Sequence, residues 1–291
     1  MEVLTRLAIG LVLSSAIGLL AYRRDALTSS GVAGAMLVGT LIFGFGGWTW
    51  GLTLIAFFVS SSLLSHYRRA EKEAVAEQFD KNERRDLGQV LANGGLGALL
   101  ALAVYFLVDL AGQARAGHPL YVYLTVAYFG VIATVNADTW ATELGVLASE
   151  RPRLITTGRP VAPGTSGGIT RYGTLAALAG AAFIGVAAFV LIQLASLATR
   201  GELLLADLSI VAIAAMAGLV GSLFDSLLGA SVQRIYWCDH CEKETERQVH
   251  GCGGRTRPLR GWIWMNNDMV NLLSSLVGGL LAGSLGLLIL L

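Results

Sequence analysis

Residues that could bind a metal ion and phosphate are concentrated in one short segment of a mostly apolar chain, 136–145. This segment carries two carboxylates, Asp138 and Glu143. If it is helical, Asn136, Thr139 and Glu143 share one stripe and Asp138 lies on the adjacent one. Carboxylates with amide and hydroxyl neighbours suit Mg²⁺, which prefers oxygen ligands and keeps several waters that phosphate oxygens can replace. The segment therefore predicts a magnesium site for a phosphorylated ligand.

Further polar residues lie near one end of other apolar segments. Asp225 and Asp268 are the acidic members of this set, and hydroxyl and amide groups lie at helical spacing beside them. Polar side chains are costly in lipid and usually face the interior of a helix bundle. We therefore expect a common pocket, to which these segments contribute Ser60, Ser61, Ser62, Ser65, Gln89, Asn93, Ser222, Asp225, Ser226, Asn267, Asp268, Asn271, Ser274 and Ser275.

A glycine-rich run at 163–168 is the candidate phosphate-binding loop. Its backbone N–H groups could turn inward and contact phosphate. The run lacks the Gly-Lys-Ser/Thr ending of a Walker A motif. The competing interpretation of the run is a simple turn. The competing interpretation of each lone Asp or Asn in a span is that it pairs only with a neighbouring helix. The residues of the run are Pro163, Gly164, Thr165, Ser166, Gly167 and Gly168.

All three cysteines lie in one charged segment, as Cys238-x₂-Cys241 followed by His250-x-Cys252. An odd count in a cytoplasmic loop argues against a disulfide framework. Three cysteines and one histidine can supply the four tetrahedral ligands of structural Zn²⁺, with no open position for catalysis. The alternatives are free thiols in a glycine-closed loop, or His240 in place of one ligand.

The elements that must position these residues are transmembrane helices. Hydrophobic residues make up 54% of the 291 residues, charged residues only 14%, and the mean hydropathy is +0.63, which excludes a soluble domain. A bilayer crossing needs roughly 20 mostly apolar residues in a helix. We predict an all-α, polytopic transmembrane bundle forming a single domain over 1–291, with about eight spans at 3–21, 31–47, 49–65, 89–111, 120–137, 173–198, 206–231 and 269–291. Only Trp48 and its neighbours separate the second and third spans. This short separation predicts a tight hairpin or a re-entrant pair.

Positive charge is distributed unevenly between the predicted loops. Eighteen of the 21 Lys and Arg residues lie in four loops, 22–30, 66–88, 138–172 and 232–268. The opposite side holds only Arg6, Arg115 and Arg200. The positive-inside rule therefore places the four loops in the cytoplasm and both termini outside. Segment 66–86, rich in both charge signs, is expected to be a solvated helix or loop. The net charge of +1 gives no reason to expect a nucleic-acid partner, and we predict none.

On these motifs the chain resembles the integral-membrane family that contains the phytyl-phosphate kinase of vitamin E synthesis in plants and cyanobacteria. The similarity covers nearly the whole chain and rests on 89–95 (QVLANGG), 136–145, 152–170, 221–233 (GSLFDSLLGASVQ), the Cys/His loop and 266–275. More distantly, the order of acidic helix ends and a Pro-Gly loop resembles phosphatidate cytidylyltransferases and dolichol kinases.

The resemblance implies Mg²⁺-dependent transfer of a phosphoryl group from a nucleoside triphosphate, with CTP favoured, to an isoprenoid monophosphate. The partners are then the nucleotide, the isoprenoid lipid phosphate and membrane lipids. The metal ligands implied are Asp138, Asp225 and Asp268, with Glu143 and Asn267 as alternates.

By the same resemblance, loop 163–168 cradles phosphates, and Arg153 and Arg159 neutralise their charge. Arg159 stands where relatives often carry Lys, which bears on the choice of donor. Two rival functions are a lipid-phosphate transporter and a cytidylyltransferase that makes a CDP-lipid. A transporter would be expected to carry polar residues near the midplane and on both sides, whereas the outer half of these spans is nearly featureless.

Overall fold

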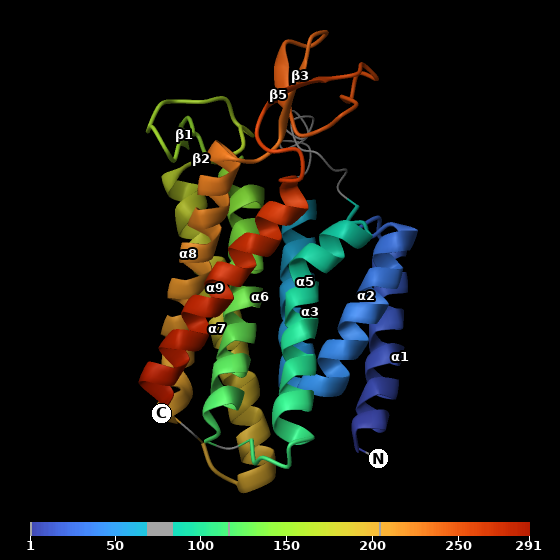
Figure 1. The fold of residues 1–291 in the computed structure, drawn as a ribbon, viewed down its shortest axis with the longest axis vertical. Coiled ribbons are helices and arrows are strands. Elements are labelled where there is room, and N and C mark those ends of the chain that lie inside the picture. Colours follow the sequence, from blue (N-terminus) through green and yellow to red (C-terminus); the bar gives the residue numbers. More distant parts are fainter. Residues whose placement is uncertain (1, 69–83, 116, 204) are drawn as a thin grey trace.

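The computed structural model describes residues 2–68, 84–115, 117–203 and 205–291. Within these ranges, eight helices are long and apolar enough to cross a membrane, and they form an elongated bundle (Figure 1). They are α1 (Glu2–Arg23), α2 with the π-helical turn η1 (Ser29–Leu41 and Ile42–Gly46), α3 (Trp48–His66), α5 with the π-helical turn η2 (Leu87–Val104 and Tyr105–Asp109), α6 (Pro119–Gly145), α7 (Arg171–Arg200), α8 (Ser209–Ser231, after the 3-10 turn η3, Leu205–Leu208) and α9 (Asn267–Leu290). Each predicted span coincides with one of these helices, so the predicted polytopic helical fold is confirmed.

The second and third spans form a tight hairpin. Turn η1 ends at Gly46 and α3 begins at Trp48. Gly47 between them has a φ of +89°, a conformation that residues with a side chain rarely adopt. Both helices are long enough to cross a bilayer. A single glycine therefore reverses the chain at this point.

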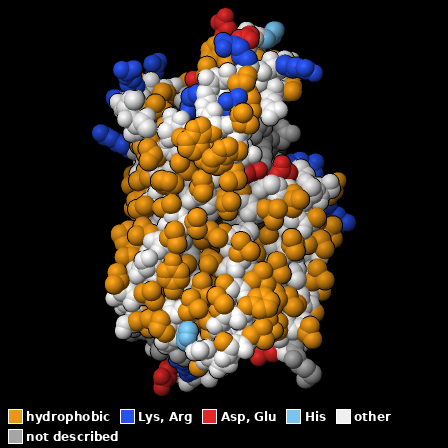
Figure 2. Space-filling view, in the orientation of Figure 1, with side chains coloured by type: hydrophobic (Ala, Val, Ile, Leu, Met, Phe, Trp, Pro, Cys, Tyr) orange, Lys and Arg blue, Asp and Glu red, His pale blue; other side chains and the backbone are white. Residues whose placement is uncertain are grey.

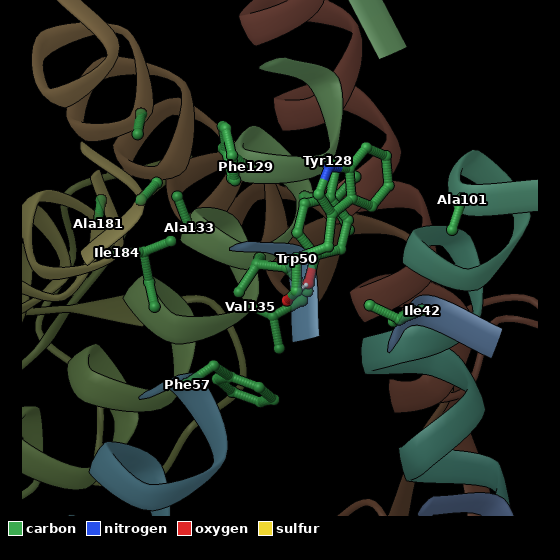
Figure 3. Close-up of a cluster of buried hydrophobic side chains, with 14 of the residues drawn as sticks. Ile42, Trp50, Phe57, Ala101, Tyr128, Phe129, Ala133, Val135, Ala181 and Ile184 are labelled. Atoms are coloured by element: carbon green, nitrogen blue, oxygen red, sulfur yellow. Dashed lines mark hydrogen bonds between the residues drawn. The ribbon is translucent and has the colours of Figure 1, made fainter. Parts of the chain in front are cut away.

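Helix α6 is the central element of the bundle and packs against α3, α5, α7, α8 and α9. All of its residues over 126–137 are buried. Where it meets α3, the rings of Trp50 and Tyr128 stack with centroids 4.1 Å apart (Figure 3). The Tyr128 hydroxyl donates to the Trp50 carbonyl oxygen at 2.7 Å, so the phenol brings no unpaired donor into the apolar core. This packing fixes the part of α6 that leads into Asp138.

Small residues bring α6 and α9 close together. A side chain added at Gly130 would meet Ala282 and the backbone of Gly278, and one added at Gly278 would meet Thr134. In lipid, apolar burial gives helices little drive to associate, so close approach and dispersion contacts hold them together. The crossing fixes α9 against the helix that carries Asp138.

The loops that carry strands lie at one end of the bundle, and the first residues of α1 and the last of α9 lie at the other (Figure 1). Two antiparallel sheets, absent from the all-α prediction, form in these loops, where water can satisfy exposed backbone groups. Figure 2 shows charged side chains at the two ends of the visible face, with a broad hydrophobic band between them. The sheets are β1 (Arg153–Leu154) with β2 (Gly168–Ile169), and β3 (Ile235–Cys238), β4 (Lys243–Thr245) and β5 (Arg257–Arg260) in the order β4-β3-β5. Of the predicted solvated segment 66–86, residues 69–83 lie outside the described ranges.

The charge asymmetry predicts that the strand-bearing end is cytoplasmic. Gln113 and Arg151 are exposed at opposite ends of the bundle and suit a labelling test. In intact bacterial cells, a membrane-impermeant maleimide should label the Gln113→Cys variant, and should label the Arg151→Cys variant only after permeabilisation. The wild-type chain, with its native cysteines, sets the background. The reverse pattern would contradict the assignment of the two ends.

Candidate functional site

A polar cavity of about 810 Å³ lies at the strand-bearing end of the bundle. The ends of α3, α5, α6, α7, α8 and α9 surround it, together with loop 163–170 and part of the Cys/His loop 232–268. These helices, far apart in sequence, meet here because five of them pack around α6. Eighteen of the residues predicted for the site or its pocket line the cavity, namely Ser62, Ser65, Gln89, Asn93, Asp138, Thr139, Glu143, Pro163, Gly164, Thr165, Ser166, Gly167, Gly168, Ser222, Asp225, Ser226, Asn267 and Asn271.

Asp138 of α6 and Asp225 of α8 form the acidic part of the cavity wall. Their carboxylates are close enough to interact electrostatically, and the Ser274 hydroxyl donates to Asp225 Oδ2 at 3.1 Å. Two like charges in a partly buried site repel each other unless a cation or a proton compensates. The pair therefore has both the oxygen donors and the electrostatic need of a divalent-cation site.

Arg85, just before α5, supplies a positive charge to the same cavity. Its Cζ lies 5.7 Å from the ring centroids of both Phe57 and Phe58, a cation–π arrangement. Burial lowers the pKa of Arg85 from its usual value, while the charge of Glu143 opposes that shift. Arginine stays protonated in proteins, so the guanidinium is a fixed cation with donors suited to phosphate.

Three arginines that sequence reasoning did not assign to the site line the cavity: Arg84, Arg85 and Arg247. The first two lie just before α5, and the available signal was that this helix carries the predicted Asn93. Arg247 belongs to the Cys/His loop, and no sequence pattern indicated that this loop folds over the cavity. The positive charge of the described lining thus comes from the N-terminal side of α5 and from the Cys/His loop.

The described lining carries more negative than positive charge. Against the three arginines stand five carboxylates, those of Asp25, Asp138, Glu143, Asp225 and Glu246. The excess of carboxylates over arginines in the described lining is therefore two, which equals the charge of one divalent cation. This balance is a second reason to expect a metal ion beside Asp138 and Asp225.

The structure places Arg153 and Arg159, predicted to neutralise phosphate charge, away from the cavity lining. Both are exposed, and Arg153 Nη1 donates to the Gly158 carbonyl oxygen at 2.9 Å. The physical reason is the β1–β2 pairing, which brings 163–168 back to the cavity but leaves 156–160 exposed at the tip of the lobe. The segment that the resemblance indicated contributes 163–170 to the cavity lining, but these two residues lie on its outer part.

Asp268 also lies outside the lining within the described part of the chain. Its Oδ2 atom lies close to Gly88, at the start of α5. A Cβ added to Gly88 would be only 2.6 Å from this oxygen. The neighbouring Asn267 and Asn271 do line the cavity. Asp268 is thus placed at the junction of α5 and α9, one residue from the site.

Asn136, predicted to bind the cofactor, is fully buried and holds helices together instead. Its Nδ2 donates to the Gly180 carbonyl oxygen at 2.7 Å, joining α6 to α7. Its Oδ1 accepts from the hydroxyls of Ser60 at 3.0 Å and Ser61 at 3.3 Å, joining α6 to α3. These partners use both ends of the amide, so its role is in packing the helices that carry the site.

Loop 163–168 is tied to the Cys/His loop by a chain of side-chain hydrogen bonds. The Ser166 hydroxyl donates to Gln233 Oε1, and Gln233 Nε2 donates to Glu246 Oε1 at 2.8 Å. Gln233 is almost completely buried, so these bonds form in a site of low polarity. The candidate phosphate loop is thereby held in one position relative to Glu246 and its neighbour Arg247.

The backbone of the loop is equally constrained. Gly167 has a φ of +81° and packs so closely on Ala230 that a side chain would overlap it, which explains the glycine. The Thr165 amide donates to the Ala162 carbonyl at 3.1 Å, and the Gly168 amide donates to the Thr165 carbonyl at 2.9 Å. Phosphate binding by this loop would therefore depend on its remaining amides, those of Gly164, Ser166 and Gly167.

Three helices begin at the cavity: α5, α7 and α9. Each has an N-cap side chain that accepts from an amide of the first turn, namely Asp86, Thr170 and Asn266. The other amides of a first helical turn carry partial positive charge and favour phosphate. The three helix ends therefore add to the attraction that the arginines exert on an anionic ligand.

The four predicted zinc ligands come together in the Cys/His loop. The ligand atoms of Cys238, Cys241, His250 and Cys252 all lie within 4.8 Å of one another. The Sγ atoms of Cys238 and Cys252 are 3.7 Å apart. Two sulfurs on one tetrahedral Zn²⁺ would be about 3.8 Å apart for Zn–S bonds of about 2.3 Å. His250 Nε2 is buried and has no hydrogen-bond partner among the described residues. The donor set and the orphaned nitrogen both fit zinc.

Comparisons with known proteins cover nearly the whole chain. The family described as integral membrane protein DUF92 matches residues 12–279. Protein PGR of Arabidopsis thaliana is 34% identical over 276 residues, which cover 94% of this chain and 93% of PGR. An uncharacterized membrane protein of Methanocaldococcus jannaschii is 31% identical over 281 residues, covering 97% and 94% of the two chains. The chloroplastic protein VTE6 of A. thaliana is 25% identical over 256 residues, covering 88% of this chain and 64% of VTE6. No solved structure matches the chain.

Proposed function

This chain belongs to the integral membrane protein family DUF92, and we propose that it transfers a phosphoryl group from a nucleoside triphosphate to an isoprenoid monophosphate. The matches to the family and to VTE6 confirm the resemblance to the phytyl-phosphate kinase family that the sequence motifs indicate. The family match and the apolar helices together show that the chain is a multi-pass membrane protein. The proposed donor is CTP, the nucleotide favoured by the resemblance, and the proposed product is the prenyl diphosphate.

One observation carries the proposal: Asp138 and Asp225 meet Arg85 and loop 163–168 in a single cavity at the polar end of an apolar bundle. Phosphoryl transfer needs mainly positioning and charge neutralisation, which carboxylate-bound metal, arginines and backbone amides supply. A water-soluble nucleotide can reach this end of the bundle. A lipid acceptor can present its phosphate here while its tail stays among apolar helices.

Each part of the site has a proposed role. Asp138 and Asp225 would hold Mg²⁺, which when bound neutralises charge on phosphate oxygens. Loop 163–168 and Arg247 would bind the triphosphate. Arg85, oriented by Glu143, would hold the acceptor phosphate. An oxygen of that phosphate, already anionic, attacks the γ-phosphorus; the bond from the γ-phosphorus to the β–γ bridging oxygen breaks, and the nucleoside diphosphate leaves. No side chain is needed as a general base, since the nucleophile carries no proton that must be removed.

A reconstituted assay tests the proposal against the two rival functions. Purified protein in detergent would be incubated with Mg²⁺, CTP or ATP, and a panel of prenyl monophosphates. We expect a prenyl diphosphate and a nucleoside diphosphate, and we expect both to disappear when EDTA removes the metal. A CDP-lipid with pyrophosphate would instead indicate a cytidylyltransferase. Unchanged substrates, with uptake of prenyl phosphate into protein-containing vesicles, would indicate a transporter.

We also propose that Cys238, Cys241, His250 and Cys252 hold one structural zinc ion. The compact ligand set supports this assignment, and four protein ligands leave no position open for catalysis. The same loop contributes Glu246 and Arg247 to the cavity lining. Zinc would therefore act on the reaction indirectly, by fixing the loop that closes the site.

A further inference from the structure

A second, apolar crevice of about 100 Å³ lies between α1, α2, α3 and α5. Nearly all of its lining is hydrophobic, including Leu13, Ile17, Ala35, Leu54 and Ile55. A cavity of this size holds roughly one isoprene unit, judged by the small apolar molecules that similar cavities accept. It lies within the apolar spans of the bundle, so a longer tail would continue between helices or into lipid.

The crevice and the polar cavity share two lining residues, Arg85 and Asn93. Asn93 Oδ1 is buried and has no hydrogen-bond partner in the described part of the chain. A buried amide oxygen without a partner costs free energy, so it indicates a donor that the isolated chain lacks. The crevice therefore ends, on the side of the polar cavity, at a cation and an unsatisfied acceptor.

The backbone holds Arg85 in place at this junction. Its amide donates to the Ala26 carbonyl at 3.0 Å, and its carbonyl accepts from the Thr28 amide at 3.0 Å. The neighbouring Arg84 is committed elsewhere, since its Nη2 donates to the Leu27 carbonyl at 3.1 Å. Arg85 is thus the arginine that lies between the apolar crevice and the polar cavity, and backbone hydrogen bonds hold it there.

We propose that this crevice binds the first part of the isoprenoid chain of the acceptor, with the acceptor phosphate held at Arg85 and Asn93. The identity of the occupant rests on the proposed function, whereas the site itself rests on the shared lining. An apolar chain with one anionic end matches both sides of the junction. A monoprotonated phosphate can accept from Arg85 and donate its hydroxyl to Asn93 Oδ1, which satisfies the orphaned acceptor.

A matched pair of variants on α2 tests the crevice without touching the polar cavity. Ala35 lines the crevice, whereas Ala33 on the same helix is exposed and lies outside that lining. We expect Ala35→Phe to raise the KM for prenyl monophosphate about tenfold, because the larger side chain would fill part of the crevice. A tenfold change corresponds to roughly two methylene groups of the isoprenoid chain losing their apolar contacts. The KM for the nucleotide should not change, and Ala33→Phe should change neither KM. An equal rise for both variants would overturn the proposal.

Photolabelling of the wild-type protein separates this inference from the proposed function, because it needs no turnover. The probe is a prenyl monophosphate that carries a diazirine on its first isoprene unit. We expect labelled peptides from the four helices that line the crevice, α1, α2, α3 and α5, and protection by excess unlabelled prenyl monophosphate. Labels confined to α7 or α8, or equal protection by phosphatidate, would overturn the crevice assignment and leave the proposed reaction standing. Labelling in the crevice of a protein that shows no turnover would support the lipid site and remove the proposed reaction.

Discussion

The Asp138→Asn and Asp225→Asn variants are each expected to lose at least ~10²-fold in phosphoryl transfer, since removing one electrostatic contact at a reacting centre often has that effect. Asparagine keeps the shape of the side chain but removes one of the two charges that would hold Mg²⁺. The chain should still insert and fold, because the substitution relieves repulsion between the two carboxylates. Initial rates at saturating Mg²⁺ and nucleotide, measured on protein of equal yield and gel-filtration profile, test this expectation.

The matched control is Asp207→Asn, the same chemical change in the turn before α8, at the end of the bundle away from the cavity. It should leave the rate unchanged. Full Mg²⁺-dependent turnover in either of the two site variants would rule out the metal site proposed here. A comparable loss in Asp207→Asn would show that the effect is a general loss of folding.

The second large effect is expected at the Cys/His loop, where His250→Ala should abolish zinc binding. The wild-type protein should contain about one zinc ion per chain, because four ligands converge on one point. Structural zinc contributes its binding free energy to folding, so the loop should also become sensitive to proteolysis when the metal is lost. Since this loop supplies Arg247 and Glu246 to the cavity, activity should fall as well.

A second histidine in the same loop provides the control. His240 is exposed and lies outside the group of four converging ligands, although its Nδ1 is 3.6 Å from the sulfur of Cys241. His240→Ala should therefore retain zinc and protease resistance. Metal analysis that finds no zinc in freshly purified wild-type protein, with all three thiols freely alkylated, would discard the site. If His240→Ala lost zinc and His250→Ala retained it, the fourth ligand would be His240, and the assignment of His250 would be wrong.

Most of the fold was predictable because a bilayer imposes strong constraints on sequence. Every crossing needs a long apolar run, so the eight spans could be located from composition alone. The conformation of the turn at Gly47 could not be read from the sequence, because its decisive feature is a backbone angle. The strands were missed because each is only two to four residues long and lies in a polar loop without alternating hydrophobicity.

The candidate site was predictable where a polar residue interrupts an apolar helix. Asp138 and Asp225 stand out in this way, and helix packing brings both to the cavity. Arg85 gave a weaker signal, since an arginine at a membrane boundary is common and ordinarily contacts water or lipid headgroups. Arg153 was assigned to the site by the family resemblance, which covers the whole segment 152–170, but hairpin pairing decides which residues of that segment turn inward. The resemblance alone could not supply that pairing.

The most direct test of the central claim is the fate of two labels in parallel reactions, one with nucleoside triphosphate labelled at the γ-phosphorus and one labelled at the α-phosphorus. Both reactions would contain wild-type protein, Mg²⁺ and a prenyl monophosphate, with the Asp138→Asn variant as the control. We predict that the γ label appears in the lipid diphosphate and that the α label stays in the nucleoside diphosphate. With the variant, the rate at which both products form should fall at least ~10²-fold. The α label in the lipid fraction, or no label in any lipid product, would contradict phosphoryl transfer at this site.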